Sequence, residues 1–206
     1  VKTVLPIIIN ENQNILMIRS FVNELKGKLE TFRTLNNNEI RKLNDIAKKY
    51  NIKYQNKHKL DLVDEILSNV DVIPNSIVLA QAAIESGWGK SRFAKEYNAL
   101  FGEYTYDDSE GVIPLERENG DTHLIKAFSS YSNSVESYFD NINSHYAYED
   151  FRDIRNIMRK RNNFSNVNLL VNKLSTYAED ENYIKTIRQV IKTNNFGIFD
   201  QKTISY

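Results

Sequence analysis

Cysteine is absent from the 206 residues of this chain, and proline and glycine are scarce, with 3 and 7 residues. The lack of cysteine excludes disulfides, a cysteine nucleophile and thiolate metal sites. No run approaches the roughly 20 apolar residues of a membrane span, and the apolar residues 4–9 are too few for a signal-peptide core. The 27 basic and 27 acidic residues cancel, so no overall field attracts nucleic acid and we expect no nucleic-acid partner.

Motifs for metal and cofactor binding are also missing. The three histidines, His58, His123 and His145, are far apart and share no ligand spacing, so we expect no metal site. The chain contains no phosphate-binding loop, no dinucleotide fingerprint and no Gly-x-Ser-x-Gly nucleophile turn. We therefore infer no cofactor.

The hydrophobic pattern is helical on both sides of a different middle section. Apolar residues recur at helical spacing before residue 70 and after residue 133, whereas residues 103–106, 111–115 and 123–128 are short β-branched and aromatic runs. Turn residues separate these runs, and Asn119-Gly120 is a strong hairpin signal. The pattern predicts a mainly α-helical α+β fold, in which a small antiparallel β-hairpin lobe interrupts a helical body.

One carboxylate lies in an otherwise apolar stretch. Glu85 is the only charged residue between Asp71 and Lys90, and the run before it predicts a buried helix, capped by Asn75 or Ser76. Burial of an isolated carboxylate is costly, so such a group tends to keep its proton. A carboxylic acid that is protonated near neutral pH is suited to general acid catalysis, and Glu85 is our first candidate for a catalytic residue.

A cleft between the helical body and the lobe is the natural place for a ligand. If Glu85 is an acid on the helical side of this cleft, hydrolysis of a glycoside would require a second group across it, which activates water or stabilises the developing positive charge. The predicted lobe supplies several carboxylates, namely Glu103, Asp107, Asp108, Glu110, Glu116 and Glu118. Glu116 and Glu118 flank Arg117 on one expected strand, and alternation would place both on the same face. Spacing alone does not choose between them.

Two motifs carry a resemblance to a known family. The run Ala83-Ile-Glu-Ser-Gly-Trp-Gly-Lys-Ser91, followed by Tyr97-Asn-Ala-Leu-Phe-Gly102, resembles the endo-β-N-acetylglucosaminidase-type peptidoglycan hydrolases, glycoside hydrolase family 73. Asp71-Val-Ile-Pro74, Ala80-Gln-Ala-Ala83 and Gly111-Val-Ile-Pro114 are similar to its Bax-type branch of bacterial envelope proteins. The resemblance covers about residues 70–193.

The resemblance implies a lysozyme-like fold and assigns roles to three residues. The catalytic Glu of the family falls on Glu85, and the second acidic residue falls on Glu116, with Glu118 as the alternative. A Tyr-Ala-x-Asp-x-x-Tyr motif maps a site tyrosine to Tyr177, in the run Tyr177-Ala-Glu-Asp-Glu-Asn-Tyr183. We expect an N-terminal helical extension over residues 1–70 and a glucosaminidase domain over 71–206, with the β-lobe at about 102–129.

Other residues near the motifs have both a structural and a substrate-binding interpretation. Ser86 would either bond the helix end or position the acetamido group of the substrate. Phe101 and Tyr104 would either stack on sugar rings or form the core of the lobe. Trp88, the single tryptophan, would either pack in the core beneath the helix end or form a platform for a sugar ring, and we expect the core position.

The predicted function is a cell-wall hydrolase that cleaves the β-1,4 bond after N-acetylglucosamine in peptidoglycan glycan strands. The alternatives are a lytic transglycosylase or a muramidase on the same fold, or a catalytically weak peptidoglycan-binding module. We expect a monomer in the periplasm or cell envelope, a location that follows from the substrate. The N-terminal helices could bind an envelope protein partner.

Overall fold

The computed structural model describes residues 1–114, 123–163, 166–178 and 180–200. The α-helices within these ranges are α1 (Val4–Glu30), α2 (Asn37–Lys49), α3 (Lys59–Asn69), α4 (Asn75–Glu85), α5 (Arg92–Tyr97), α6 (Tyr131–Ser144), α7 (Glu149–Lys160), α8 (Val167–Val171) and α9 (Tyr183–Thr193). Short 3-10 helices cover Tyr146–Tyr148 and Phe196–Phe199. The strands are β1 (Tyr104–Thr105), β2 (Gly111–Val112) and β3 (Leu124–Lys126). Among these elements no helix is long and apolar enough to cross a lipid bilayer.

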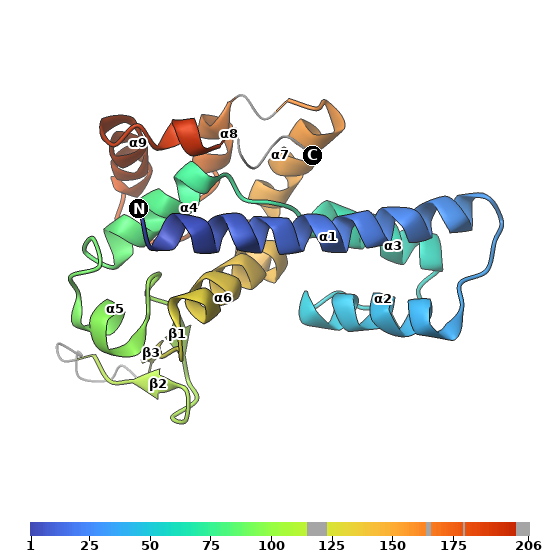
Figure 1. Cartoon of the computed structure of the whole chain (residues 1–206), viewed down its shortest axis with the longest axis horizontal. Helices are drawn as coiled ribbons and strands as arrows, with labels where there is room; N and C mark the ends of the chain where they lie inside the picture. The colour runs from blue at the N-terminus through green and yellow to red at the C-terminus, as the bar shows by residue number, and fades with distance from the viewer. Residues whose placement is uncertain (115–122, 164–165, 179, 201–206) are drawn as a thin grey trace.

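Helix α1 runs along most of the molecule and packs against α3, α4 and α6 (Figure 1). It begins at Val4 and accommodates Pro6 because this residue lies in the first turn, where its missing N–H costs no hydrogen bond. Ile8, Ile15 and Val22 recur at a spacing of seven on its buried face. The helices before residue 70 therefore share one core with the rest of the chain, and the division at residue 70 stays a prediction.

Helix α4 lies in the centre of the fold, against α1, α9 and the 3-10 helix Phe196–Phe199. Every residue from Asn75 to Ala82 is buried, as expected for a run that is apolar on nearly all faces. The expected cap by Asn75 or Ser76 is wrong, because the helix already includes both residues. Asp200 supplies the missing acceptor: its Oδ1 accepts from the Ser76 N–H at 2.8 Å and its Oδ2 from the Ser76 hydroxyl at 2.6 Å.

The predicted β-lobe is a three-stranded antiparallel sheet in the order β1-β3-β2. Tyr104 pairs with Ile125, and Gly111 pairs with Lys126. Gly111 lies so close to β3 that an added Cβ would be 2.5 Å from Leu124 Cβ, so only glycine fits at this position. The Asn119-Gly120 hairpin lies outside the described residues.

The mainly helical α+β class with a small antiparallel lobe is confirmed by these elements. In Figure 1 the strands and α5 lie on one side of α1, and α7, α8 and α9 lie on the other. Helix α6 has a side-chain cap at its N-terminus. Helix α6 begins after Ser130, whose side chain accepts from the Asn133 N–H, and Glu136 forms an ion pair with Lys49 at 2.7 Å.

Candidate active site

A cavity of about 650 Å³ lies where the C-terminal end of α4 meets the lobe. Its walls come from the segment entering β1, from the end of α6 and the 3-10 helix that follows, and from the segment before α9. The lining residues are Glu85, Phe101, Gly102, Glu103, Tyr104, Asn141, His145, Tyr148, Thr176, Tyr177 and Ala178. Glu85, Phe101, Tyr104 and Tyr177, predicted from the sequence as site residues, thus lie around one cavity.

Glu85 is the last residue of α4 and is half-buried in the wall of this cavity. Burial raises the pKa of its carboxyl, and a hydrogen bond from the Tyr183 hydroxyl to Oε1, 2.7 Å long, opposes that rise. The other oxygen, Oε2, lies beside Gly102, where an added Cβ would be only 3.8 Å away. The carboxyl of Glu85 therefore has one oxygen held by a hydrogen bond and a second oxygen that lies beside the backbone of Gly102.

A chain of hydrogen bonds connects the helical core to Glu85. The Tyr138 hydroxyl donates to Gln81 Oε1 at 2.6 Å, and Gln81 Nε2 donates to the Tyr183 hydroxyl at 2.9 Å. Tyr183 then donates to Glu85. Gln81 and Glu85 are four residues apart and so lie on the same face of α4. All donors point toward the carboxylate, so each bond in the chain fixes the orientation of the next.

The structure separates the two tyrosines of the Tyr177–Tyr183 motif. The Tyr177 hydroxyl donates to the Phe101 carbonyl at 3.0 Å, and its ring stacks on that of Tyr183 with the centroids 5.7 Å apart. Tyr177 thus lines the cavity, whereas Tyr183 makes the direct contact with Glu85. Our sequence analysis quoted Tyr183 within the motif but gave it no role. The only signal in the sequence was its place as the second tyrosine of the motif; the packing of α9 against α4 is visible only in the structure.

Phe101 and Tyr104 occupy different environments in the cavity wall. Phe101 is buried and stacks on Tyr138 with the ring centroids 4.2 Å apart, so its ring is part of the core. Tyr104 is 65% exposed and lies 4.3 Å, between ring centroids, from His123. Of these two aromatic residues, Tyr104 is therefore the one whose ring is available to a ligand.

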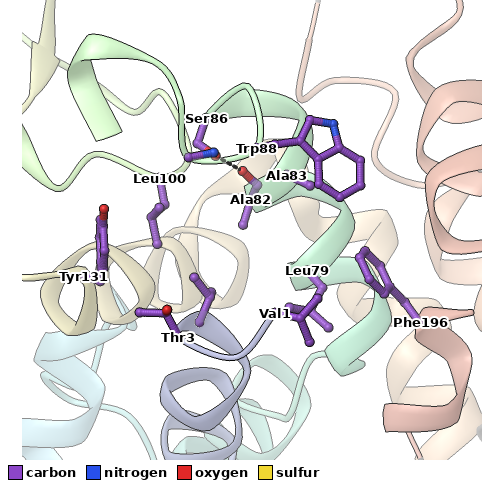
Figure 2. A pocket seen from close by; sticks show the side chains of 12 residues that line it. Val1, Thr3, Leu79, Ala82, Ala83, Ser86, Trp88, Leu100, Tyr131 and Phe196 are labelled. Atoms are coloured by element: carbon purple, nitrogen blue, oxygen red, sulfur yellow. Dashed lines mark hydrogen bonds between the residues drawn. The ribbon is translucent and has the colours of Figure 1, made fainter. Parts of the chain in front are cut away.

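Ser86 and Trp88 line a separate cavity of about 200 Å³, together with Leu79, Leu100 and Phe196 (Figure 2). The Ser86 hydroxyl donates to the Ala82 carbonyl and accepts from the Gly89 N–H at 2.8 Å. Ser86 thus bonds the end of its helix, which is one of the two roles considered for it. Its side chain lines this smaller cavity and not the Glu85 cavity. The expectation for Trp88 is wrong, because the side chain is 55% exposed.

The predicted second carboxylates, Glu116 and Glu118, lie outside the described residues. Within the described ranges Glu103 lines the Glu85 cavity and is largely buried. Burial raises the pKa of its carboxyl to about 7, against the lowering effects of a hydrogen bond from Ser137 and the charge of Lys126. No three histidine, aspartate or glutamate residues of the described chain are close enough to hold a metal ion.

Residues 60–196 match the model of the glucosaminidase family, described as mannosyl-glycoprotein endo-beta-N-acetylglucosaminidase. The chain belongs to this family. The matched range contains Glu85, Glu103, Tyr177 and Tyr183 and every lining residue of the Glu85 cavity. The family predicted from the Glu-Ser-Gly-Trp-Gly run is therefore confirmed.

Relatives of this glucosaminidase-family chain include Protein bax of Escherichia coli K12, which is 32% identical over 179 residues. That match covers 86% of this chain and 61% of Protein bax. Peptidoglycan hydrolase FlgJ of Escherichia coli K12 is 35% identical over 92 residues, which cover 40% of this chain and 29% of FlgJ. The chain thus spans less than two thirds of either relative.

A search of solved structures found the catalytic domain of the autolysin Auto from Listeria monocytogenes, at 19% sequence identity and a TM-score of 0.48. The match covers 88% of this chain and 86% of that domain.

Proposed function

We propose that this chain hydrolyses the β-1,4 glycosidic bond that follows N-acetylglucosamine in peptidoglycan glycan strands. The observation that carries the proposal is the placement of Glu85: a half-buried carboxyl at a helix end, with a raised pKa, in a cavity of about 650 Å³ between the helical body and the β-lobe. Family membership supports the glucosaminidase chemistry. The name of the relative FlgJ, a peptidoglycan hydrolase, supports the substrate class.

In the proposed reaction Glu85 is the general acid. Its proton moves from the carboxyl to the glycosidic oxygen as the bond between that oxygen and the anomeric carbon breaks. The hydrogen bond from Tyr183 fixes Oε1, and this leaves Oε2, beside Gly102, to hold the proton. Tyr177, in the wall of the same cavity, is proposed to orient the site around the anomeric carbon.

The second half of the reaction delivers water to the anomeric carbon. Glu116 is proposed to take the proton of that water or to stabilise the charged intermediate, with Glu118 as the alternative; neither lies in the described residues. The acetamido group of the substrate is a further internal nucleophile, which would make a second carboxylate less necessary. Because peptidoglycan lies in the cell envelope, we place the protein in the periplasm or at the cell surface, and the N-terminal helices are a proposed contact for an envelope partner.

Digestion of purified peptidoglycan, with mass spectrometry of the products, tests the proposal. The parent protein is expected to release fragments with reducing N-acetylglucosamine ends, and Glu85→Gln to release none. Glu96→Gln is the matched control, because Glu96 is an exposed glutamate on the neighbouring helix α5, and it should cleave like the parent. Circular dichroism of both variants shows that they are folded.

Other products would overturn the proposed reaction. Anhydro-muramic ends would establish a lytic transglycosylase, and reducing muramic ends a muramidase. Glycan binding without turnover by the parent would establish a binding module.

A further inference from the structure

The two carboxylate oxygens of Glu103 have different surroundings. Its Oε2 accepts a hydrogen bond from the Ser137 hydroxyl at 2.9 Å. Its Oε1 is buried and has no hydrogen-bond partner within the described part of the chain. Buried polar atoms without partners are rare in native proteins, and each one requires an explanation. Because Glu103 lines the Glu85 cavity, a donor from a ligand in that cavity would explain this one.

Charged residues from the lobe and from two helices lie around Glu103. They are Lys126 on β3, paired with Glu110 of the lobe, Asp140 on α6, and Glu85 on α4. The pKa of the Tyr148 hydroxyl is raised to about 12, mainly by burial. The negative charges of Glu103 and, more weakly, of Glu85 contribute to this rise. Tyr148 therefore lies within electrostatic range of the two carboxyls, which belong to one site.

Two described neighbours of Glu103 have other partners than its Oε1. Ser137 bonds the other oxygen, and Lys126 is paired with Glu110 at 3.6 Å. A glycan of N-acetylated sugars, in contrast, carries hydroxyl and acetamido N–H donors on each ring. A hydrogen bond from such a donor to an ionised, desolvated carboxylate is about twice as strong as one between neutral groups.

We propose that Glu103 is a further substrate-contacting residue of this site, whose Oε1 accepts a hydrogen bond from a hydroxyl or acetamido N–H of the bound glycan. This inference rests on the proposed function for its ligand, and it adds a second contact residue from the base of the β-lobe. Glu85 acts from the helical side, and Glu103 fixes the sugar from the side of β1. Since the acceptor is the ionised form, binding requires Glu103 to lose its proton.

Binding of a soluble tetrasaccharide of alternating N-acetylglucosamine and N-acetylmuramic acid tests this inference. The affinity is measured by isothermal titration calorimetry. The background protein is Glu85→Gln, because loss of the proposed acid keeps the ligand intact. Adding Glu103→Ala is expected to weaken binding about tenfold or more at pH 8, as for the loss of a hydrogen bond to a charged group. Asp108→Asn, which removes an exposed carboxylate of the same lobe, is the matched control and should not change the affinity.

The pH dependence separates a substrate contact from a structural role. In the background protein the affinity should fall as the pH falls from 8 to 6, because protonation removes the anionic acceptor. With Glu103→Gln this dependence should be lost. His123 and His145 are present in both proteins, so the difference isolates Glu103. Ser137→Ala removes a bond that lowers the pKa of Glu103 and should move the midpoint to higher pH.

Two results would overturn the inference, and they differ from each other. If the background protein binds the tetrasaccharide but Glu103→Ala and Glu103→Gln bind it equally well, the contact is absent and the proposed function stands. If the background protein binds no glycan at any pH, the proposed substrate itself is wrong, and the assignment of Glu103 is wrong with it.

Discussion

The hydroxyl of Tyr183 donates a 2.7 Å hydrogen bond to Oε1 of Glu85, across 98 residues of sequence. Tyr183 is the first residue of α9, and Glu85 is the last residue of α4. The packing of these two helices therefore fixes the orientation of the proposed acid. Gln81, one turn earlier on α4, donates a hydrogen bond from its Nε2 to the same Tyr183 hydroxyl at 2.9 Å.

Removing this hydroxyl should change the pH profile of cleavage. Because the Tyr183 bond lowers the pKa of Glu85 against the effect of burial, Tyr183→Phe should raise that pKa. The rate depends on protonated Glu85, so its decline at high pH should move to higher pH. We also expect the maximal rate to fall roughly tenfold, since the acid loses its fixed orientation. The measurement is the rate of glycan release from pH 4 to pH 9.

Tyr177→Phe is the control for this experiment. It removes a hydroxyl from the stacked ring, but that hydroxyl bonds the Phe101 carbonyl and not Glu85. The maximal cleavage rate of Tyr177→Phe can differ from that of the parent. The pH at which its rate declines on the alkaline side should equal that of the parent. An unshifted decline in Tyr183→Phe would contradict the proposed coupling between the two residues.

Gly102 has a backbone φ of +64° and lies beside Oε2 of Glu85. A side chain is strained in this left-handed region, so Gly102→Ala should lower the free energy of unfolding by about 1–2 kcal/mol. The added methyl would also touch the carboxyl oxygen that is proposed to carry the proton, and the cleavage rate should fall. Urea denaturation measures the stability change. Gly27→Ala is the control: Gly27 lies within α1 with open space around it, and this change should stabilise by about 0.5–1 kcal/mol.

The buried carboxyl of Glu103 should make the stability of the protein depend on pH. Its pKa is raised to about 7 in the native state, against an ordinary value near 4.5. Below pH 4.5 both states are protonated and the group has no effect. As the pH rises from 4.5 through 7, the unfolded state releases the proton first, so the native state loses stability. The full penalty at pH 8 is on the order of 3 kcal/mol.

Glu103→Gln removes this penalty. The variant should be more stable than the parent at pH 8, and the difference should vanish near pH 4. Asp140, whose pKa burial also raises, to about 6, titrates in both proteins and cancels in the comparison. Equal stability of the two proteins at pH 8 would show that Glu103 is not buried as described.

Asp71 precedes α4 and neutralises a cluster of arginines. It accepts two hydrogen bonds from Arg159, at 2.8 and 2.6 Å, and lies 3.4 Å from Arg19. The buried Arg155 binds the Asp71 carbonyl at 2.9 Å. Although burial opposes it, the bond from Arg159 and the charges of the arginines lower the pKa of Asp71. The stability that the group contributes is therefore present at neutral pH and is lost as the pH falls through its native pKa.

Asp71→Asn should cost about 3–5 kcal/mol of unfolding free energy at pH 7, because it leaves buried positive charge without its counter-charge. Asp64→Asn is the control: Asp64 forms an exposed ion pair with Lys26 at 2.7 Å, and its loss should cost less than about 1 kcal/mol. Chemical denaturation at pH 7 compares the two. Similar costs for both changes would contradict the assigned role of Asp71.

The sequence by itself determined the family, the α+β class and the candidate acid. The Glu-Ser-Gly-Trp-Gly run is local, and a lone carboxylate in an apolar helix has a raised pKa for reasons that need no knowledge of the fold. The helical and strand periods are likewise local properties, so α4, α6 and the β-lobe were predictable. The cap of α4 was not predictable in this way, because Asp200, 124 residues away in the sequence, accepts the hydrogen bonds of Ser76 at the position where Asn75 or Ser76 was expected to be the cap.

Only the tertiary structure decided which residues surround Glu85. Tyr183 contacts Glu85 because α9 packs against α4, and Gln81 and Tyr138 are connected to Glu85 only through the Tyr183 hydroxyl. Glu103 reaches the same cavity because the chain turns at Gly102 into β1. Ser86, next to Glu85 in sequence, faces another cavity, because neighbouring residues at a helix end point about 100° apart. Proximity across such distances depends on the summed packing of many side chains, which no short motif encodes.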